Sequence, residues 1–178
     1  MNRKNILAII GSASQLSSNE SLVHYINQII GNDFRVTLFK DLKQLPHFDP
    51  ELSSNSPPVS VVNLRRAVEK ADGVIICTPE YIFSIPSGLK NALEWCVATT
   101  VFQDKPLGII TASASGEKGH AELQLIMQTV MAKFNERTTL LVQGIRGKIA
   151  DNGDIKDPQL VQNLTAFVEA FRQLVQVG

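Results

Sequence analysis

Short apolar runs alternate with amphipathic segments along most of the chain, and this alternation restricts the fold more than any other feature. The run at 6–10 is continuously apolar, as expected of a strand that is covered on both faces. Strand-sized segments recur at 34–39, 73–77, 106–111 and 138–142. Apolar residues at helical spacing follow them at 20–30, at 59–71, from Pro86 or Ser87 onward, at 121–134 and from Pro158 onward. Strict alternation of this kind predicts a parallel sheet with helices on both faces.

Five strands and five helices in this order favour one strand arrangement. The commonest order for five such strands is 2-1-3-4-5, so we predict an α/β fold, a flavodoxin-like three-layer sandwich. No linker or repeat interrupts the pattern in these 178 residues, and a single domain spanning 1–178 is expected. The polar segment 41–58 is expected to be a loop with a functional or interfacial role. Asp157 and Pro158 predict the start of the last helix, as its cap and first turn.

The composition disfavours several classes of function. Hydrophobic residues make up 44% of the chain and charged residues 19%, as is typical of a soluble globular protein. The 17 basic and 17 acidic side chains cancel, and no basic run supports nucleic-acid binding. The apolar runs are too short for a transmembrane helix, and the run at 6–10 is too short for the core of a signal peptide. We therefore expect a cytoplasmic protein.

The sequence contains no clear set of catalytic or metal-binding side chains. Cys77 and Cys96 lack a CxxC partner and an adjacent histidine, so two buried free thiols are expected in a reducing compartment. The acidic segment 151–154 lacks the rest of a calcium-binding pattern, so a tight turn is expected there. The histidines are scattered over the predicted elements, and only the last is beside a strand-end loop: His24, His47 and His120.

The loop after the first strand, residues 11–19, is rich in side-chain hydrogen-bond donors and leads into a helix. The donors are Ser12, Ser14, Ser17, Ser18 and Asn19. Backbone amides and the dipole at the helix start complete an anion site made of neutral groups. The loop lacks the Gly-Lys-Ser ending of a P-loop and the three glycines of a dinucleotide motif, so it suits a terminal phosphate monoester. The alternative is a polar loop in which Ser18 or Asn19 only caps the helix.

A second strand-end loop, residues 79–86, has a proline at each end and an aromatic pair in the middle. Strand ends of this kind form the ligand crevice of α/β proteins, and the stiffened loop favours a flat ligand. The alternative is that Tyr81 and Phe83 are ordinary core aromatics. Glu80 would then be solvated, or would orient the loop through an ion pair with Lys90.

A third strand-end loop, residues 113–120, is built from small residues, among them Ser113, Ser115 and Gly116. Small side chains let backbone amides approach the edge of a planar ligand. Alone, this loop is as consistent with a mobile segment as with a site. In the predicted sheet, however, all three loops lie at the same edge, and together they indicate a binding site.

These loops are similar to motifs of the NADPH-dependent FMN reductase family, which includes quinone, azo-dye and chromate reductases. The similarity covers about residues 6–142, and the second motif is its most specific part. The three motifs are Gly11-Ser12 with Ser17 and Asn19; Pro79-Glu80-Tyr81, Ser84-Ile85-Pro86, Leu89-Lys90-Asn91-Ala92 and Trp95; and Ser115-Gly116 with Gly119.

The resemblance implies a role for each loop in holding FMN. Ser12, Ser17 and Asn19 would hold the phosphate, and Ser14 and Ser18 belong to the same candidate loop. The segment Pro79, Glu80, Tyr81, Ile82, Phe83 and Ser84 would form the wall beside the isoalloxazine ring. Ser113, Ser115 and Gly116 would face the pyrimidine edge of that ring.

The resemblance further implies an FMN oxidoreductase that takes a hydride from NADH or NADPH and passes electrons to a small acceptor. The acceptor would be a quinone, an azo compound, a metal oxyanion or a free flavin. The flavin supplies the chemistry, so no catalytic side chain and no metal is predicted. Family members commonly form homodimers or homotetramers. The alternatives are a flavodoxin-type electron carrier, which zero net charge disfavours, and a cofactor-free interaction module.

Two departures from the family pattern stand out. Family members usually carry arginine where this chain has Ser14, so the phosphate loop here has no cation. They usually carry Asn-Gly where this chain has Ile82-Phe83, and the loop thereby loses a glycine suited to positive φ. We expect Phe83 to stack over the ring or to pack against a second subunit. These changes bear on the choice of hydride donor and on acceptor size.

Overall fold

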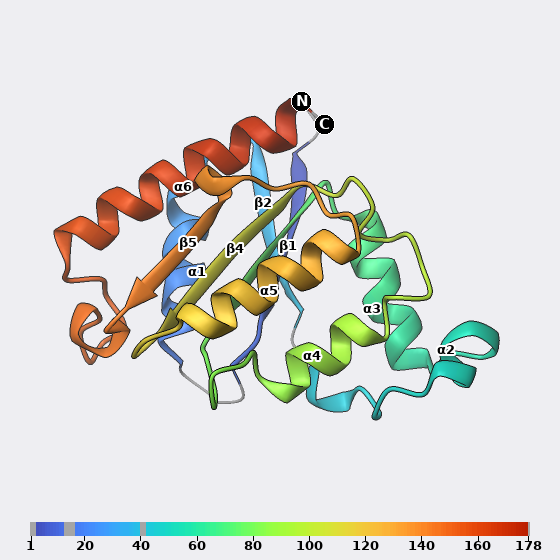
Figure 1. The fold of residues 1–178 in the computed structure, drawn as a ribbon. Helices are drawn as coiled ribbons and strands as arrows, with labels where there is room; N and C mark the ends of the chain where they lie inside the picture. The colour runs from blue at the N-terminus through green and yellow to red at the C-terminus, as the bar shows by residue number, and fades with distance from the viewer. Residues whose placement is uncertain (1–2, 13–16, 40–41, 178) are drawn as a thin grey trace.

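The structure is a computed structural model that describes residues 3–12, 17–39 and 42–177. Five parallel strands form one sheet in the order β2-β1-β3-β4-β5, which confirms the predicted topology (Figure 1). The strands are β1 (Lys4–Ile10), β2 (Phe34–Phe39), β3 (Gly73–Thr78), β4 (Leu107–Ser113) and β5 (Thr139–Gln143).

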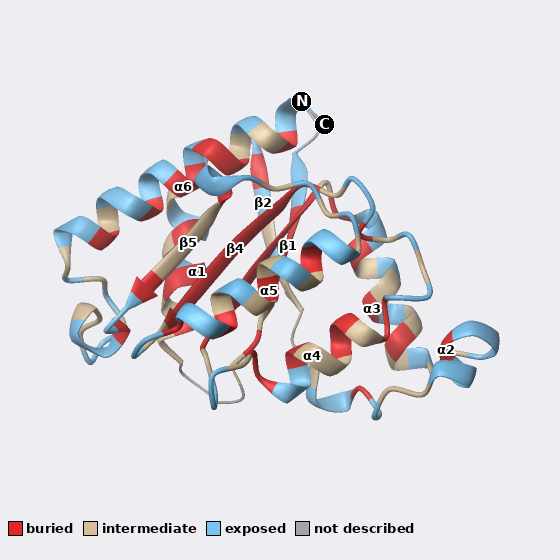
Figure 2. Cartoon of the chain, in the orientation of Figure 1, coloured by how far each residue is buried: buried red, intermediate tan, exposed pale blue. Residues whose placement is uncertain are grey.

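Helices cover both faces of this sheet. On one face α3 (Val59–Lys70), α4 (Ser87–Glu94) and α5 (Glu117–Thr129) enclose one hydrophobic cluster. On the other face α1 (Ser18–Ile29) and α6 (Pro158–Val177) enclose a second. Figure 2 shows the buried residues concentrated in the sheet and on the inner sides of these helices. Within the described ranges, no helix is long and apolar enough to cross a membrane.

The central strands are apolar throughout because helices cover both of their faces. All six residues of β3 are buried. Two strand glycines let α6 lie directly on the sheet. A Cβ atom at Gly73 would lie 2.8 Å from the side chain of Val175, and one at Gly108 would lie 2.7 Å from Phe167. Larger residues at these two positions would push α6 away from the sheet.

The segment 41–58 is more regular than the sequence predicted. Within its described part, a 3₁₀ turn, η1 (Leu42–Gln44), precedes a short helix, α2 (Pro50–Asn55). Asp49 caps α2, because its Oδ1 accepts hydrogen bonds from the amides of Glu51 and Leu52 at 2.9 and 3.0 Å. The expectation of an irregular loop is therefore wrong for this part of the chain.

The helix predicted over 121–134 begins and ends earlier, as α5. It begins at Glu117 because Gly116 turns the chain at φ +93° and donates its amide to Glu80. It ends at Thr129, and Met131 just beyond it has a positive φ of 59°.

Two local predictions near the C-terminus are confirmed. Oδ1 of Asp157 accepts the amide of Leu160 at 2.7 Å at the start of α6. The segment 151–154 is a tight turn, closed by the amide of Ala150 on the carbonyl of Asp154 at 2.8 Å, with Gly153 at φ +88°. Two further 3₁₀ turns flank β5: η2 (Glu136–Thr138) and η3 (Ile145–Lys148).

Two residues of the second motif fasten the segment 42–58 to α4. Asn91 Oδ1 accepts the amide of Phe48, and its Nδ2 donates to the carbonyl of Pro46, both at 2.8 Å. The buried Trp95 indole donates to the same carbonyl at 2.8 Å and packs edge-on against the Phe48 ring. Asn91 and Trp95 therefore act in the architecture of the chain.

Replacing Asn91 with alanine should destabilise the protein by about 1–3 kcal/mol, because the Phe48 amide and the Pro46 carbonyl lose a partner in a half-buried place. The measurement is the midpoint of urea unfolding. Asn63→Ala on the exposed side of α3 is the control and should change stability by less than about 0.5 kcal/mol. Equal midpoints for the two variants would contradict the fastening role.

The connection from β3 to α4 contains a tight two-residue turn in a strained conformation. The amide of Tyr81 donates to the carbonyl of Ser84 at 2.9 Å, and the reverse bond is 3.1 Å. Between them Ile82 and Phe83 have φ values of 50° and 60°. Such turns favour Asn-Gly because both central residues have positive φ, and a β-branched residue there is a genuine outlier. The turn keeps the backbone shape for which Asn-Gly is suited, at a conformational cost.

Replacing the pair by Asn-Gly (Ile82→Asn with Phe83→Gly) should stabilise the protein by about 1–2 kcal/mol, because positive φ costs branched and bulky residues that much. Little packing is lost, since Ile82 is 94% exposed and Phe83 is 74% exposed. Urea unfolding measures the gain, with Val97→Asn, at another exposed apolar position, as the control. A loss of stability would show that the two side chains make stabilising contacts.

Candidate functional site

A cavity of about 740 Å³ lies at the carboxyl edge of the sheet, within the size range of small-molecule pockets. Four connections line it, each of which follows a strand: Ser12 with 17–19 after β1, 79–81 after β3, 112–114 at the end of β4, and 144–147 after β5. Three of them are the loops that the sequence singled out.

The first connection brings neutral hydrogen-bond donors to the start of α1. Ser17 is the N-cap residue, and its Oγ accepts the amide of Glu20 at 3.3 Å. The amides of Ser18 and Asn19 have no partner within α1, because the helix begins at Ser18. Such a helix start attracts anions. Ser12 lines the same cavity, and the candidate Ser14 lies outside the described residues.

The side chain of Asn19 is engaged within the protein. It is 3% exposed, donates from Nδ2 to the carbonyl of Ala112 at 3.3 Å, and accepts the Cys77 thiol at Oδ1, also at 3.3 Å. The side chain of Asn19 therefore ties α1 to the ends of β3 and β4. Burial raises the pKa of the Cys77 thiol well above its usual range and that of Cys96 to about 12, so neither acts as a thiolate.

The second connection contributes Pro79, Glu80 and Tyr81 to the cavity lining. Tyr81 is 42% exposed, and Ile82 and Phe83 project from the adjacent turn without lining the cavity. The alternative in which Tyr81 and Phe83 are core aromatics is therefore wrong.

Glu80 holds the second connection against the third. Its two carboxylate oxygens accept the amides of Gly116 at 3.1 Å and Gly119 at 2.8 Å, at the start of α5. The ion pair with Lys90, one of the alternatives for Glu80, does not form, since Lys90 instead approaches the carboxylates of Glu94 and Glu122, each at 4.0 Å.

A second carboxylate braces the same turn from α5. Oε2 of Glu122 accepts the hydroxyl of Ser84 at 2.7 Å and the amide of Ile85 at 3.0 Å. The side-chain hydroxyl of Ser84 thus points to α5, and Ser84 does not line the cavity. Together Glu80 and Glu122 fix both sides of the strained turn.

The third connection is only partly in the cavity. Ser113 lines it and lies 3.4 Å, Oγ to carbonyl oxygen, from Glu80. Ser115 is exposed outside the lining, and Gly116 donates its amide to Glu80. The sequence predicted that amides of this loop face the edge of a ring. In the structure, the amide of Gly116 is instead hydrogen-bonded to the Glu80 carboxylate.

The fourth connection was missed by the sequence analysis. Gly144 turns the chain after β5 at φ +62° and donates its amide to the carbonyl of Ala114 at 3.1 Å, and Ile145, Arg146 and Gly147 complete the lining. A usable signal was present: two glycines follow the last strand, whose carboxyl end lies at the same edge as the others.

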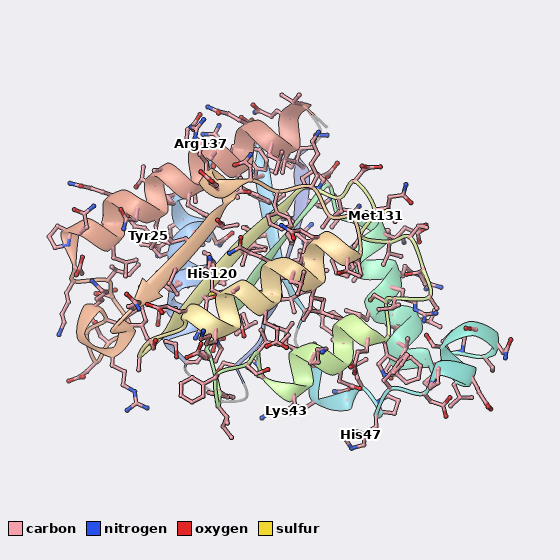
Figure 3. The ribbon with its side chains drawn as sticks, viewed as in Figure 1. Tyr25, Lys43, His47, His120, Met131 and Arg137 are labelled. Carbon is pink, nitrogen blue, oxygen red and sulfur yellow. The ribbon has the colours of Figure 1, made fainter. Side chains whose placement is uncertain are left out.

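No histidine lines the cavity. His120, on α5, has its Nδ1 2.9 Å from Oγ1 of Thr111, and burial lowers its pKa, so the neutral form predominates at neutral pH (Figure 3). Across residues 3–12, 17–39 and 42–177, no cluster of three metal-ligating side chains forms. The cavity therefore presents hydroxyls, backbone amides, one arginine and one aromatic ring, a lining that suits a ligand with an anionic end and a flat body.

Comparison with known proteins agrees with this geometry. The sequence model of the NADPH-dependent FMN reductase family matches residues 4–143. The NADH:(hydroxy)cinnamate reductase subunit CrdA of Vibrio ruber is 30% identical, over 96% of this chain and 85% of the relative. The quinone reductase of Escherichia coli K12 is 26% identical, over 96% and 95% of the two chains.

Solved structures show the same fold. The flavoenzyme FerB, an NAD(P)H:(acceptor) oxidoreductase from Paracoccus denitrificans, superposes with a TM-score of 0.79 over 97% of both chains, at 24% identity. An NADH:FMN oxidoreductase, EmoB, superposes with a TM-score of 0.68 over 96% of this chain and 89% of its own. With a family match that spans most of its length, this chain belongs to the NADPH-dependent FMN reductase family.

Proposed function

We propose that this protein is an NAD(P)H-dependent FMN oxidoreductase whose cofactor lies in the cavity formed by the four strand-end connections. The observation that supports this most is the pairing, in one cavity, of the amides at the start of α1, which have no partner within the helix, with the wall of Pro79 and Tyr81. An anion at the first and a flat ring at the second match the two ends of FMN.

The residues present fit this cofactor. Ser12, Ser17 and the amides of Ser18 and Asn19 would hold the phosphate. When bound, FMN supplies the chemistry, accepting a hydride and releasing electrons to a second substrate, and the protein binds and orients. Pro79 and Tyr81 would flank the ring, and the small residues 112–114 leave room for its edge.

The remaining candidates of the second and third connections would act by position. Ser84 and Gly116 satisfy the carboxylates of Glu122 and Glu80, and so fix the wall beside the ring. Ile82 and Phe83 stand exposed next to that wall, where they would meet a bound acceptor or a second subunit. Ser115 lies further out on the same rim.

The proposed acceptor is a small quinone or a related flat molecule. Relatives of nearly the same length are named quinone reductase and, in Burkholderia, 2-hydroxy-1,4-benzoquinone reductase. The exposed rings of Tyr81 and Phe83 offer aromatic surface for such a molecule. A cytoplasmic homodimer or homotetramer is part of this proposal, supported by the two free cysteines and by the exposed apolar pair Ile82 and Phe83.

Purified protein should bind FMN and turn yellow, and NADH or NADPH should bleach it in air-free buffer. A small quinone should then restore the colour. The measurement is the flavin absorbance over time. If neither nucleotide bleaches the reconstituted protein, the enzyme assignment fails. If bleaching occurs but no small acceptor restores the colour, the electron-carrier alternative is favoured.

Replacing Ser12 and Ser17 together with alanine should weaken FMN binding, because each hydroxyl would donate to a charged phosphate and such bonds contribute about 1.5–3 kcal/mol. Fluorescence titration gives the Kd. Ser54→Ala, on the exposed helix α2, is the matched control and should bind FMN as the unaltered protein does. Unchanged FMN affinity in the double variant would place the phosphate elsewhere.

A further inference from the structure

The first connection has no cation for a phosphate. Residues 11–19 contain neither lysine nor arginine. Among the described residues that line the cavity, only Glu80 and Arg146 are charged. Both oxygens of Glu80 are engaged by the amides at the start of α5, on the side of the third connection. Arg146, from the turn after β5, is therefore the one described cation available to an anion in this cavity.

The residues around Arg146 hold the turn in place. The amide of Gly144 donates a hydrogen bond to the carbonyl of Ala114, and the amide of Gly147 donates one to the carbonyl of Gly144 at 3.0 Å. Ile145 is 5% exposed and anchors the turn in the core on the α1 and α6 face. On the far side Lys148 forms a 2.7 Å ion pair with Asp157. Arg146 alone of this turn's basic side chains lines the cavity.

Arg146 also lines a second cavity of about 640 Å³ between α1 and the segment 149–155. The two cavities have three residues in common, Ser17, Ser18 and Arg146, so Arg146 lies where the cavities meet, beside the start of α1. That junction is also where the amides of Ser18 and Asn19 lack helical partners.

The guanidinium is not committed to another group in the described part of the chain. The second cavity contains the carboxylates of Glu20, Asp151 and Asp154, but none of them is within ion-pair distance of Arg146. Asp154 instead accepts a hydrogen bond from the side chain of Asn152 at 2.6 Å. Arg146 is exposed, so extending toward a ligand requires no repacking of the core.

We propose that Arg146 binds the phosphate of FMN, so that the turn after the last strand supplies the charge that the first loop lacks. The planar guanidinium presents paired donors that match two phosphate oxygens, while Ser17 and the helix amides contact the others. Arg146 thereby selects the phosphorylated flavin over riboflavin. This proposal rests on the proposed function, since it concerns the same cavity.

The test compares FMN with riboflavin, which has the same ring but no phosphate. Arg146→Ala should raise the Kd for FMN at least about tenfold and leave that for riboflavin unchanged. Arg146→Lys keeps the charge without the paired donors and should give an intermediate loss. In Arg146→Ala, which loses the charge, FMN affinity should also depend less steeply on salt concentration than in the unaltered protein. Fluorescence titration at two salt concentrations measures all three effects.

Arg137 provides the matched control. It is exposed and lies in η2, just before β5 (Figure 3). Arg146 lies just after β5, so the two arginines flank opposite ends of one strand. Arg137→Ala removes the same charge from the whole protein and should leave both Kd values unchanged. An equal loss of FMN affinity in both variants would mean that net charge alone acts, and would overturn the proposal.

The remaining outcomes distinguish the role of Arg146 from the proposed function of the protein. If Arg146→Ala weakens FMN and riboflavin equally, Arg146 shapes the cavity and does not contact the phosphate. If Arg146→Ala changes neither Kd, the phosphate is bound without Arg146. If the unaltered protein binds neither flavin, the proposed function itself fails.

Discussion

All five strands run parallel, and the cavity depends on this constraint. The register pairs Ile10 with Cys77, Thr78 with Thr111 and Ser113 with Gln143. Neighbouring strands of β1, β3, β4 and β5 therefore end at nearly the same height in the sheet. Four connections that are far apart in sequence therefore meet at one edge. Each can be short, because the helix that follows carries the chain back along the sheet.

The shape of that edge is then fixed by two carboxylates. The Glu80 carboxylate accepts hydrogen bonds from two amides at the start of α5. The Glu122 carboxylate accepts the hydroxyl of Ser84 and the amide of Ile85 at the end of the Tyr81–Ser84 turn. Positive φ at Ile82 and Phe83 costs conformational energy, and a turn in this state persists only where its surroundings determine it. The hydrogen bonds of Glu80 and Glu122 determine it here. The turn therefore keeps its backbone conformation while the side chains of Ile82 and Phe83 project outward.

The sequence was sufficient to predict most of the elements that depend on neighbours along the chain, although it missed the short helix α2. Apolar runs such as 73–77 and the cap at Asp157 are local signals, and the strand order follows from their alternation. The early start of α5 was not predictable in this way, because the carboxylate that stabilises it belongs to Glu80, far away in sequence. The same reason explains Asn19, whose side chain looked like a phosphate ligand and is bonded to Ala112 and Cys77.

The sequence alone also offered no reason to single out Arg146 as a binding residue. Its segment has no hydroxyl-rich pattern, and an exposed arginine in a turn is usually a solvated residue. Its proposed role arises because the connections after β1 and β5 line the same cavity, and the strand order of the sheet brings them together. Charge at a binding site need not come from the loop that carries the recognisable motif. In a parallel sheet, a cation that is absent from one strand end can be supplied from another, because several of the ends line the same cavity.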